Sequence, residues 1–198
     1  MFRELGEQLR KPSGPLGKLV AKIMDRRNKE FYENIIIDLE LKSGDKIYEI
    51  GFGPGLGIGL IAGKRLDCTI HGIDFSELMV RRATKRNQKF IDDGTVNLRH
   101  DDFLTATIDL GKYDKVYCVN VIYFWSDLNS VFSKIYSMLN KKGMYCIFMI
   151  PDKKLINRKF AEEFFKYPIG QVEIALQKAG FKSIEYKLDK GYYIKARK

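Results

Sequence analysis

The chain has 198 residues, a formal net charge of +10 at pH 7, three cysteines and two histidines. This length suits one domain and allows it to bury about two thirds of the surface of the unfolded chain, so disulfides and structural metals are not required. The odd cysteine count and the distant histidines exclude a disulfide framework and a His-based metal cluster, and we predict no bound metal.

The cysteines, Cys68, Cys118 and Cys146, have apolar or β-prone neighbours and are interpreted as buried strand thiols in a reducing compartment. The N-terminus lacks a basic stretch followed by an apolar core. No apolar run approaches the ~18 residues that a membrane span needs. We therefore expect a cytoplasmic protein.

Residues 1–44 form a basic segment in front of the main domain. Prolines and glycines in and just after residues 1–14 predict an irregular start. From Leu16 to Met24 apolar residues recur at helical spacing, and a second helix is expected from about Lys29 to Leu39. We expect this helical segment to cover the active site.

Strands and helices alternate over residues 45–198. Apolar runs predict parallel strands, helices follow most of them, and Ser76 and either Ser126 or Asp127 are candidate helix N-caps. A final hairpin is expected about Asp189-Lys190-Gly191. This order predicts an α/β fold with a doubly wound parallel sheet, whose ligand site lies beyond the carboxyl ends of the strands. The expected parallel strands are 47–50, 68–74, 97–101, 115–120 and 144–150.

Glycines dominate the loop after the first strand, which has the sequence Glu49-Ile50-Gly51-Phe52-Gly53-Pro54-Gly55. Glycine allows a positive φ and lets backbone N–H groups approach a ligand closely. Asp74 ends the next strand, at about the separation (~20 residues) from which an acid accepts both ribose hydroxyls of a nucleoside. A further acid pair, Asp101-Asp102, ends the third strand. Together these features predict a nucleoside site.

A nicotinamide dehydrogenase is the alternative of another class. Its Gly-x-Gly-x-x-Gly/Ala fingerprint would require a small residue where Leu56 stands. The matching run from Gly57 to Ala62 begins too far into the helix. A non-catalytic module that keeps the cofactor pocket is a third interpretation.

The glycine loop resembles the first motif of the class I S-adenosylmethionine-dependent methyltransferases, a family with a seven-stranded sheet and an antiparallel last strand. The resemblance spans roughly residues 45–198. Residues 8–28 resemble one widespread bacterial branch of small methyltransferases with mostly unassigned substrates. The other matching motifs are Gly72-Ile73-Asp74-Phe75-Ser76, Asp101-Asp102-Phe103, Tyr113-Asp114-Lys115-Val116, Leu139-Asn140-Lys141-Lys142-Gly143 and Ala179-Gly180-Phe181.

This resemblance implies S-adenosylmethionine as cofactor and S-adenosylhomocysteine as product. Glu49 would orient the loop or meet the methionine ammonium. Gly51, Gly53 and Gly55 would let the backbone approach the cofactor, and Asp74 would hold the ribose.

Further positions are implied around the adenine and the methionine. Phe75 and Met79 would flank the adenine, and Asn120 would lie near the methionine moiety. Asp102 would accept from the adenine amino group, and the Phe103 amide would reach a ring nitrogen.

The acid before Asp102 is an open alternative. The family usually has a small residue before a single acid, whereas this sequence has a doublet, so Asp101 also remains a candidate adenine partner.

The substrate side is expected just after the fourth strand, in Asn120-Val121-Ile122-Tyr123-Phe124-Trp125. Aromatic rings at Tyr123 and Trp125 can stack on a flat acceptor or receive a cationic amine, whereas Phe124 can equally pack a helix onto the sheet. Tyr123 is the candidate catalytic residue, as a general base or as an orienting hydroxyl. Methyl transfer from a sulfonium is a direct displacement, so alignment can supply most of the acceleration.

The acceptor is expected to be a small molecule, methylated on O, N or C. The motif of amino-methylating nucleic-acid enzymes is absent, and the basic residues of 81–89 fall on one helix face as in a solvated surface, so nucleic acid is not an expected partner. The alternative is a lipid headgroup or membrane-associated quinone-type methyltransferase that docks peripherally through the basic N-terminal helix. The oligomeric state is left open.

Overall fold

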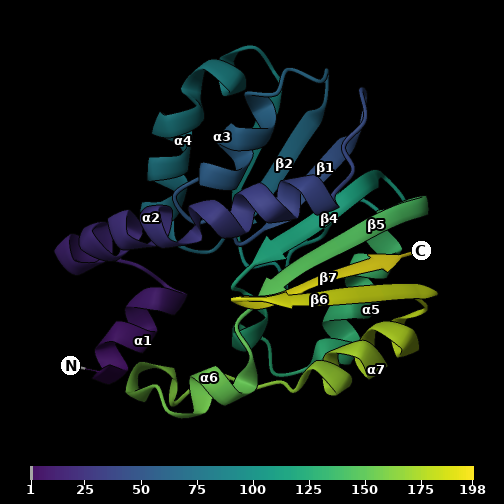
Figure 1. Ribbon diagram of the computed structural model, residues 1–198. Helices are drawn as coiled ribbons and strands as arrows, with labels where there is room; N and C mark the ends of the chain where they lie inside the picture. The colour runs from purple at the N-terminus through teal and green to yellow at the C-terminus, as the bar shows by residue number, and fades with distance from the viewer. Residues whose placement is uncertain (1) are drawn as a thin grey trace.

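A computed structural model describes residues 2–198 and has one seven-stranded sheet of order β3-β2-β1-β4-β5-β7-β6 (Figure 1). Strands β1 to β5 pair in parallel, and β7 is antiparallel to both β5 and β6. The predicted doubly wound, mostly parallel sheet with an antiparallel C-terminal hairpin is therefore confirmed. The strands are β1 (Lys46–Ile50), β2 (Thr69–Asp74), β3 (Val96–His100), β4 (Tyr113–Val119), β5 (Leu139–Met149), β6 (Ser183–Asp189) and β7 (Gly191–Arg197).

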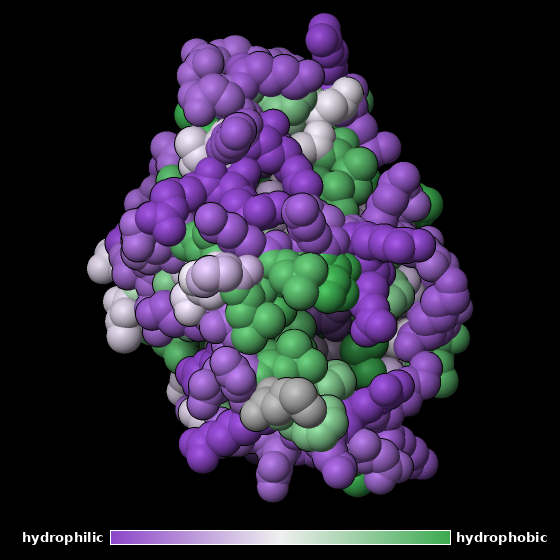
Figure 2. All heavy atoms as spheres, turned by 90° about the vertical axis from the view of Figure 1, so that its left-hand side faces the viewer, coloured by the Kyte–Doolittle hydropathy of each residue, from purple (hydrophilic) through white to green (hydrophobic). Residues whose placement is uncertain are grey.

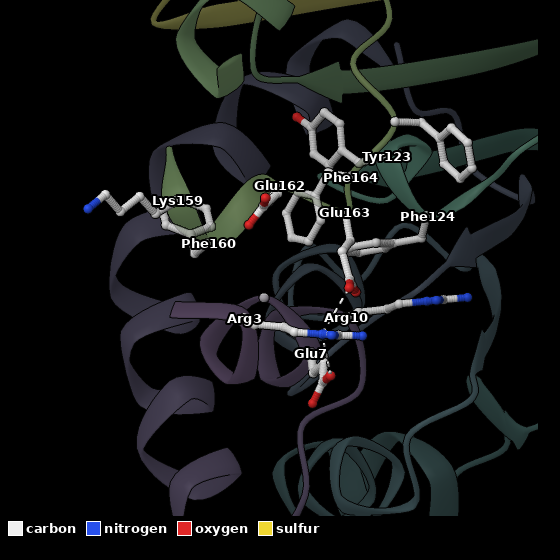
Figure 3. A pocket seen from close by; sticks show the side chains of 12 residues that line it. Arg3, Glu7, Arg10, Tyr123, Phe124, Lys159, Phe160, Glu162, Glu163 and Phe164 are labelled. Carbon is white, nitrogen blue, oxygen red and sulfur yellow. Dashed lines mark ion pairs between the residues drawn. The ribbon is translucent and has the colours of Figure 1, made fainter. Parts of the chain in front are cut away.

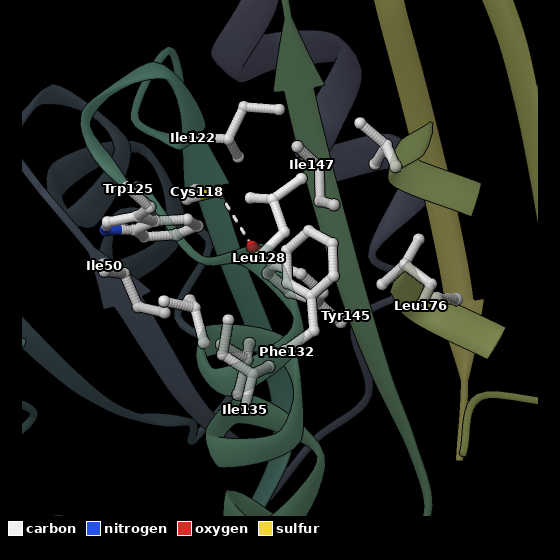
Figure 4. Packing of buried hydrophobic residues seen from close by; sticks show 14 of the residues in the cluster. Ile50, Cys118, Ile122, Trp125, Leu128, Phe132, Ile135, Tyr145, Ile147 and Leu176 are labelled. Carbon is white, nitrogen blue, oxygen red and sulfur yellow. Dashed lines mark hydrogen bonds between the residues drawn. The ribbon is translucent and has the colours of Figure 1, made fainter. Parts of the chain in front are cut away.

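Helices cover both faces of this sheet. The N-terminal helix α2 (Gly14–Asp38) shares one buried apolar cluster with α3 (Leu56–Ala62) and α4 (Glu77–Asp92). On the other face, α5 (Leu128–Met138) and α7 (Ile169–Ala179) pack on Tyr145 and Ile147 of β5 (Figure 4). Burial on both faces explains why the central strands are almost wholly apolar.

Local sequence signals set several of the boundaries. The Ser76 hydroxyl accepts from the Met79 amide at 3.4 Å, and the Asp127 carboxylate accepts from the Asn129 and Ser130 amides, so Asp127 is the second cap. Gly180 ends α7 at φ +108°. The tight turn into β7 places Lys190 at φ +55°.

The prediction of an irregular N-terminus is wrong, because α1 (Phe2–Arg10) is a helix. The prolines lie beyond its end, and Gly6 allows close contact with the backbone of Phe160 in η2 (Lys159–Ala161). The two separate helices expected after Leu16 are also one continuous helix, α2. Tertiary contacts therefore decide the shape of residues 1–44.

Two shorter elements complete the chain, η1 (Ile122–Phe124) and α6 (Asp152–Ile156). Cys68, Cys118 and Cys146 are free and buried, as predicted, and burial raises the pKa of the Cys118 thiol to about 12. Across residues 2–198, none of the helices has both the length and the apolar character that crossing a membrane requires.

Candidate active site

The glycine loop leaves β1 at the carboxyl edge of the sheet. Gly51, Gly53 and Gly55 have φ values of +71°, +54° and +78°, a region that side chains with a β-carbon rarely adopt. A Cβ on Gly55 would also lie 2.7 Å from the Cβ of Ala83 in α4. The loop conformation is thus fixed both by its backbone and by the helix beside it.

Asp74 holds this loop from the end of β2. One carboxylate oxygen accepts from the Gly53 amide at 2.8 Å, and the other accepts from the Ser76 amide at 2.9 Å. Burial raises the pKa of the Asp74 carboxyl to about 6, against the lowering effect of the two amides. Each oxygen retains a lone pair, so the carboxylate can accept from further donors.

Helix α4 clamps the loop from outside. The Arg86 guanidinium donates to the Pro54 carbonyl at 2.9 Å and to the Asp25 carboxylate of α2 at 2.6 and 2.7 Å. The Asn87 amide donates to the Gly55 carbonyl at 3.1 Å. Neither Arg86 nor Asn87 could be predicted from the sequence, because only the packing of α4 shows which of its polar side chains turn inward.

Glu49 lies beneath the loop with no exposed surface. Its carboxylate accepts from the Tyr117 hydroxyl at 2.6 Å, and burial raises its pKa to about 7. Tyr32 of α2 lies close by, where a Cβ on Gly57 would come within 2.6 Å of its ring. Gly57 is therefore a packing glycine.

A cavity of about 440 Å³, including its open mouth, lies at the ends of β1, β2 and β3. Five residues predicted to bind the cofactor line it, and we therefore call it the cofactor-side cavity. The Phe103 amide donates to no other group within residues 2–198 and so remains available to a ligand. The candidate residues on the cavity wall are Gly51, Asp74, Phe75, Asp101, Asp102, Phe103 and Trp125.

The two acids of the doublet differ in their partners. Asp101 is ion-paired with Arg99 and accepts from the Asp102 amide at 2.8 Å, and the amide and the guanidinium lower its pKa. Asp102 accepts from the Leu104 amide with one oxygen, at 2.9 Å. The second Asp102 oxygen has no hydrogen-bond partner in the described part of the chain.

Two predicted residues lie elsewhere than expected. Met79 is buried against Ala21 and Leu78 and does not line the cofactor-side cavity. Trp125, predicted on the substrate side, lies in the cofactor-side cavity with its ring centroid 6.2 Å from that of Phe103. Its position follows from the turn after η1, which returns the chain toward the β3 loop.

A second, larger cavity of about 1310 Å³, including its mouth, lies on the other side of Phe124. Asn120 lines it at φ +60°, and its amide donates to Asn28 of α2 at 3.2 Å. The Tyr123 hydroxyl donates to the Asn120 side chain at 3.1 Å and accepts from the Ile150 amide. Burial raises the pKa of the Tyr123 hydroxyl far above its usual value.

The N-terminal helix approaches this site from outside. Figure 3 shows Arg3, Glu7 and Arg10 of α1 facing Glu163 and Phe164 of the segment around η2. The Arg3 guanidinium pairs with the Glu163 carboxylate at 2.9 Å. Arg10 lines both this hollow and the cofactor-side cavity. It was not predicted as a site residue, because the N-terminus was expected to be irregular.

Known proteins share this sheet and loop. Residues 47–143 match the family model described as a methyltransferase domain. The "uncharacterized methyltransferase YdaC" of Bacillus subtilis is 29% identical over 82% of this chain and 86% of its own. Sterol 24-C-methyltransferase of Candida albicans is 24% identical, and the match covers 76% of this chain but only 43% of the yeast enzyme.

Solved structures show the same fold. Phosphoethanolamine N-methyltransferase 2 of Haemonchus contortus, in complex with S-adenosyl-L-methionine, superposes with a TM-score of 0.70 at 24% identity over 80% of this chain and 38% of its own. Geranyl diphosphate C-methyltransferase of Streptomyces coelicolor, in complex with S-adenosyl-L-homocysteine, gives 0.72 at 15% identity over 87% and 79%.

The sheet order, the glycine loop and the matching family model define a Rossmann-like methyltransferase domain. Residues 47–143 form a methyltransferase domain similar to those of the class I S-adenosylmethionine-dependent family, and solved structures of this fold hold S-adenosylmethionine or S-adenosylhomocysteine. The dehydrogenase alternative gains no support from these relatives.

Proposed function

We propose that this protein transfers the methyl group of S-adenosylmethionine to a small-molecule acceptor. The observation that carries the proposal is that two cavities share the Phe124 wall. One is lined by Gly51, Asp74 and Asp102, and the other by Asn120 and Tyr123. A nucleoside in the first and an acceptor in the second would meet at that wall.

The residues of the first cavity fit the adenosine part of the cofactor. Asp74 would accept from the ribose hydroxyls with its remaining lone pairs. Asp102 is favoured over Asp101 for the adenine amino group, because its second oxygen is free, and the Phe103 amide would donate to a ring nitrogen. Phe75 would contact the adenine face, with Met79 supporting α4 from behind.

The methionine part would extend toward the loop and Asn120. Glu49, buried and held by Tyr117, is assigned to orienting the loop rather than to meeting the ammonium. When bound, S-adenosylmethionine supplies a methyl group on a sulfonium that already carries the leaving-group charge. The protein therefore has to bind, align and exclude water, and no acid–base pair is required.

Tyr123 is assigned an orienting role rather than that of a general base. Burial disfavours its phenolate, and its hydroxyl is held between Asn120 and the Ile150 amide. A Tyr123→Phe variant should therefore misplace Asn120 and lower turnover without removing an acidic limb from the pH profile.

The cofactor test is calorimetric titration with S-adenosylmethionine, S-adenosylhomocysteine and NADH. We expect both sulfur nucleosides to bind and NADH not to bind. Asp74→Asn should weaken binding at least tenfold, since it removes a charged acceptor. Asp45→Asn is the matched control, because Asp45 is also buried and accepts from a backbone amide, that of Lys42 at 2.8 Å, but precedes β1. Failure of the wild type to bind either sulfur nucleoside would overturn the proposal.

Peripheral membrane contact is a second candidate property, favoured by α2. Leu16, Leu19 and Ile23 are 38%, 56% and 45% exposed at helical spacing, among basic residues. Figure 2 shows hydrophobic side chains gathered in the middle of the face that carries α1 and the start of α2, framed by hydrophilic ones. Anionic vesicles should bind the protein less as salt rises, and Leu19→Asp should weaken binding whereas Leu110→Asp, on a distant exposed loop, should not.

A further inference from the structure

The larger cavity has an apolar inner wall. The rings of Tyr123 and Phe164 are stacked, with centroids 6.1 Å apart and an interplanar angle of 8°, and Phe124 meets Phe164 edge-on at 5.0 Å. Leu155 and Phe31 extend this wall. Such a surface binds an apolar body by burial and by ring contacts.

The same cavity carries positive charge. Arg27 of α2 lines it from one part of the chain, and Lys154 of α6 and Arg158, just before η2, line it from another. Among its lining residues, all within 2–198, there is neither an aspartate nor a glutamate. Three cations and no acid around an apolar wall create a positive potential that is focused by its low-dielectric surroundings.

Nearby carboxylates do not neutralise these cations. Glu30, one turn beyond Arg27 on α2, accepts from the Lys190 ammonium at 2.5 and 2.7 Å, and Asp25 is paired with Arg86. The Lys154 ammonium donates only to the Lys190 carbonyl, at 2.9 Å.

The side-chain N–H groups of Arg27 and Arg158 are all free to donate to a ligand. Neither the Arg27 nor the Arg158 guanidinium has a hydrogen-bond or ion-pair partner within the described chain, residues 2–198. Two free planar guanidinium groups beside one cavity suit a phosphate or carboxylate, because their donors can bind its oxygens in pairs.

We infer that the methyl acceptor is an anionic amphiphile, with an apolar body against the Tyr123–Phe164 wall and a phosphate or carboxylate held by Arg27, Lys154 and Arg158. This inference rests on the proposed function, since it names the substrate class of the same site. A cationic amine would face three like charges, and a neutral apolar molecule would desolvate those charges without pairing them. The amphiphile can be free in water or presented by a membrane.

The test uses three probes with the same twelve-carbon chain: dodecyl phosphate, dodecyltrimethylammonium and dodecyl maltoside. Each is titrated calorimetrically below its critical micelle concentration, with S-adenosylhomocysteine saturating so that the cofactor's own carboxylate is already in place. Dodecyl phosphate should bind at least tenfold more tightly than the other two. Inorganic phosphate should bind at least tenfold more weakly than dodecyl phosphate, because it lacks the apolar body.

Charge-removal variants locate the site. Arg27→Gln and Arg158→Gln should each weaken dodecyl phosphate binding about tenfold, since each removes a charge-assisted donor. Arg26→Gln is the matched control, because Arg26 is the next residue of the same helix, is exposed and does not line the cavity. The affinity for S-adenosylhomocysteine is measured in every variant.

The outcomes separate two failures. If S-adenosylhomocysteine does not bind, the proposed function fails. If it binds but the cationic or neutral amphiphile binds as tightly as dodecyl phosphate, or if Arg26→Gln weakens binding as much as Arg27→Gln, the acceptor class is wrong. Co-sedimentation with phosphatidylglycerol vesicles, lost in Arg27→Gln, would identify a membrane source; dodecyl phosphate binding without co-sedimentation would identify a free acceptor.

Discussion

The Asp74 carboxylate joins the end of β2 to the glycine loop and to the start of α4, through the Gly53 and Ser76 amides. Its pKa is raised to about 6 by burial, so it is mostly ionised at pH 7 and mostly protonated at pH 5. A carboxyl that must accept from ribose hydroxyls binds them best when ionised. The protonation state of this one residue should therefore control cofactor affinity.

We predict that the affinity for S-adenosylhomocysteine falls about tenfold between pH 7 and pH 5 in the wild type. The sign follows from proton competition, because the ligand favours the ionised form and the raised pKa brings protonation into this range. Calorimetry at both pH values measures it. Asp74→Asn should bind weakly at both, and a wild-type affinity that does not change with pH would contradict the assignment of Asp74 to the ribose.

Glu49 affects the pH dependence of stability rather than the affinity for a ligand. Its pKa of about 7 in the folded protein exceeds its ordinary value of 4.5, so the folded state favours the protonated form. The stability that this protonation contributes is complete below pH 4.5 and is lost as pH rises through about 7. Burial causes the effect and outweighs the hydrogen bond from Tyr117.

We predict that Glu49→Gln removes this pH dependence. Between pH 5 and pH 8 the free energy of unfolding of the wild type should fall by about 2 kcal/mol relative to the variant, since one pKa unit corresponds to about 1.4 kcal/mol. Urea unfolding at the two pH values measures it, and the glutamine oxygen can still accept from Tyr117. Glu40→Gln should keep the wild-type dependence, because the Arg197 side chain lowers the pKa of Glu40. Equal slopes for wild type and Glu49→Gln would refute the prediction.

At the scale of elements, α1 shows how a contact defines a helix. A Cβ on Gly6 would collide with the Phe160 carbonyl oxygen, so α1 lies unusually close to η2. Pro12 lies just beyond its end, so all of its helical residues precede that proline. Alanine is the better helix former by about 1 kcal/mol, yet at this position packing opposes it.

We predict that Gly6→Ala releases α1 from η2. Amide hydrogen exchange should show loss of protection in residues 6–10, while β4 and β5 remain protected, because local opening of a terminal element does not require global unfolding. Glu4→Ala, at an exposed position of the same helix, should leave the exchange of α1 unchanged. Unchanged or greater protection in Gly6→Ala would mean that helix propensity dominates and that the contact with Phe160 yields.

Helix α2 connects distant parts of the molecule along its whole length. Asp25 pairs with Arg86 of α4, Asn28 accepts from Asn120 after β4, and Asp38 pairs with Lys187 of β6 at 3.0 Å. Amphipathic spacing in the sequence predicted helix here, but it could not predict one uninterrupted helix. A single continuous α2 is favoured because its contacts with α4, with Asn120 and with β6 hold its whole length along one axis.

For the whole molecule, cofactor binding should be linked to unfolding, because the cofactor-side cavity is assembled from three strand ends, Gly51 of the glycine loop and Arg10 of α1. At a free S-adenosylhomocysteine concentration of about 100 times Kd, the free energy of unfolding should rise by about 2.7 kcal/mol. Thermal and urea unfolding with and without ligand measure it. NADH at the same concentration should give no increase, and Asp74→Asn should lose most of it. A stabilisation by NADH equal to that by S-adenosylhomocysteine would contradict a sulfonium-nucleoside site.

The sequence by itself determined the sheet and one half of the site. Apolar strand runs, the caps at Ser76 and Asp127, and the spaced residues Gly51, Asp74 and Asp102 are local signals, because propensity, capping and backbone freedom act within a few residues. Parallel pairing then brings the carboxyl ends together at one edge. That is why five of the ten residues predicted to bind the cofactor, Gly51, Asp74, Phe75, Asp102 and Phe103, line one cavity.

The tertiary structure alone decided the other half. Arg27 lies more than a hundred residues before Lys154 and Arg158, and no local signal in the sequence marks these two parts of the chain as neighbours. The same holds for Trp125, which the turn after η1 moves to the cofactor side, and for Arg86 and Asn87, which packing turns toward the loop. The glycine loop could be predicted from the sequence because its conformation depends on its own residues, whereas the larger cavity is formed by side chains that only folding brings together.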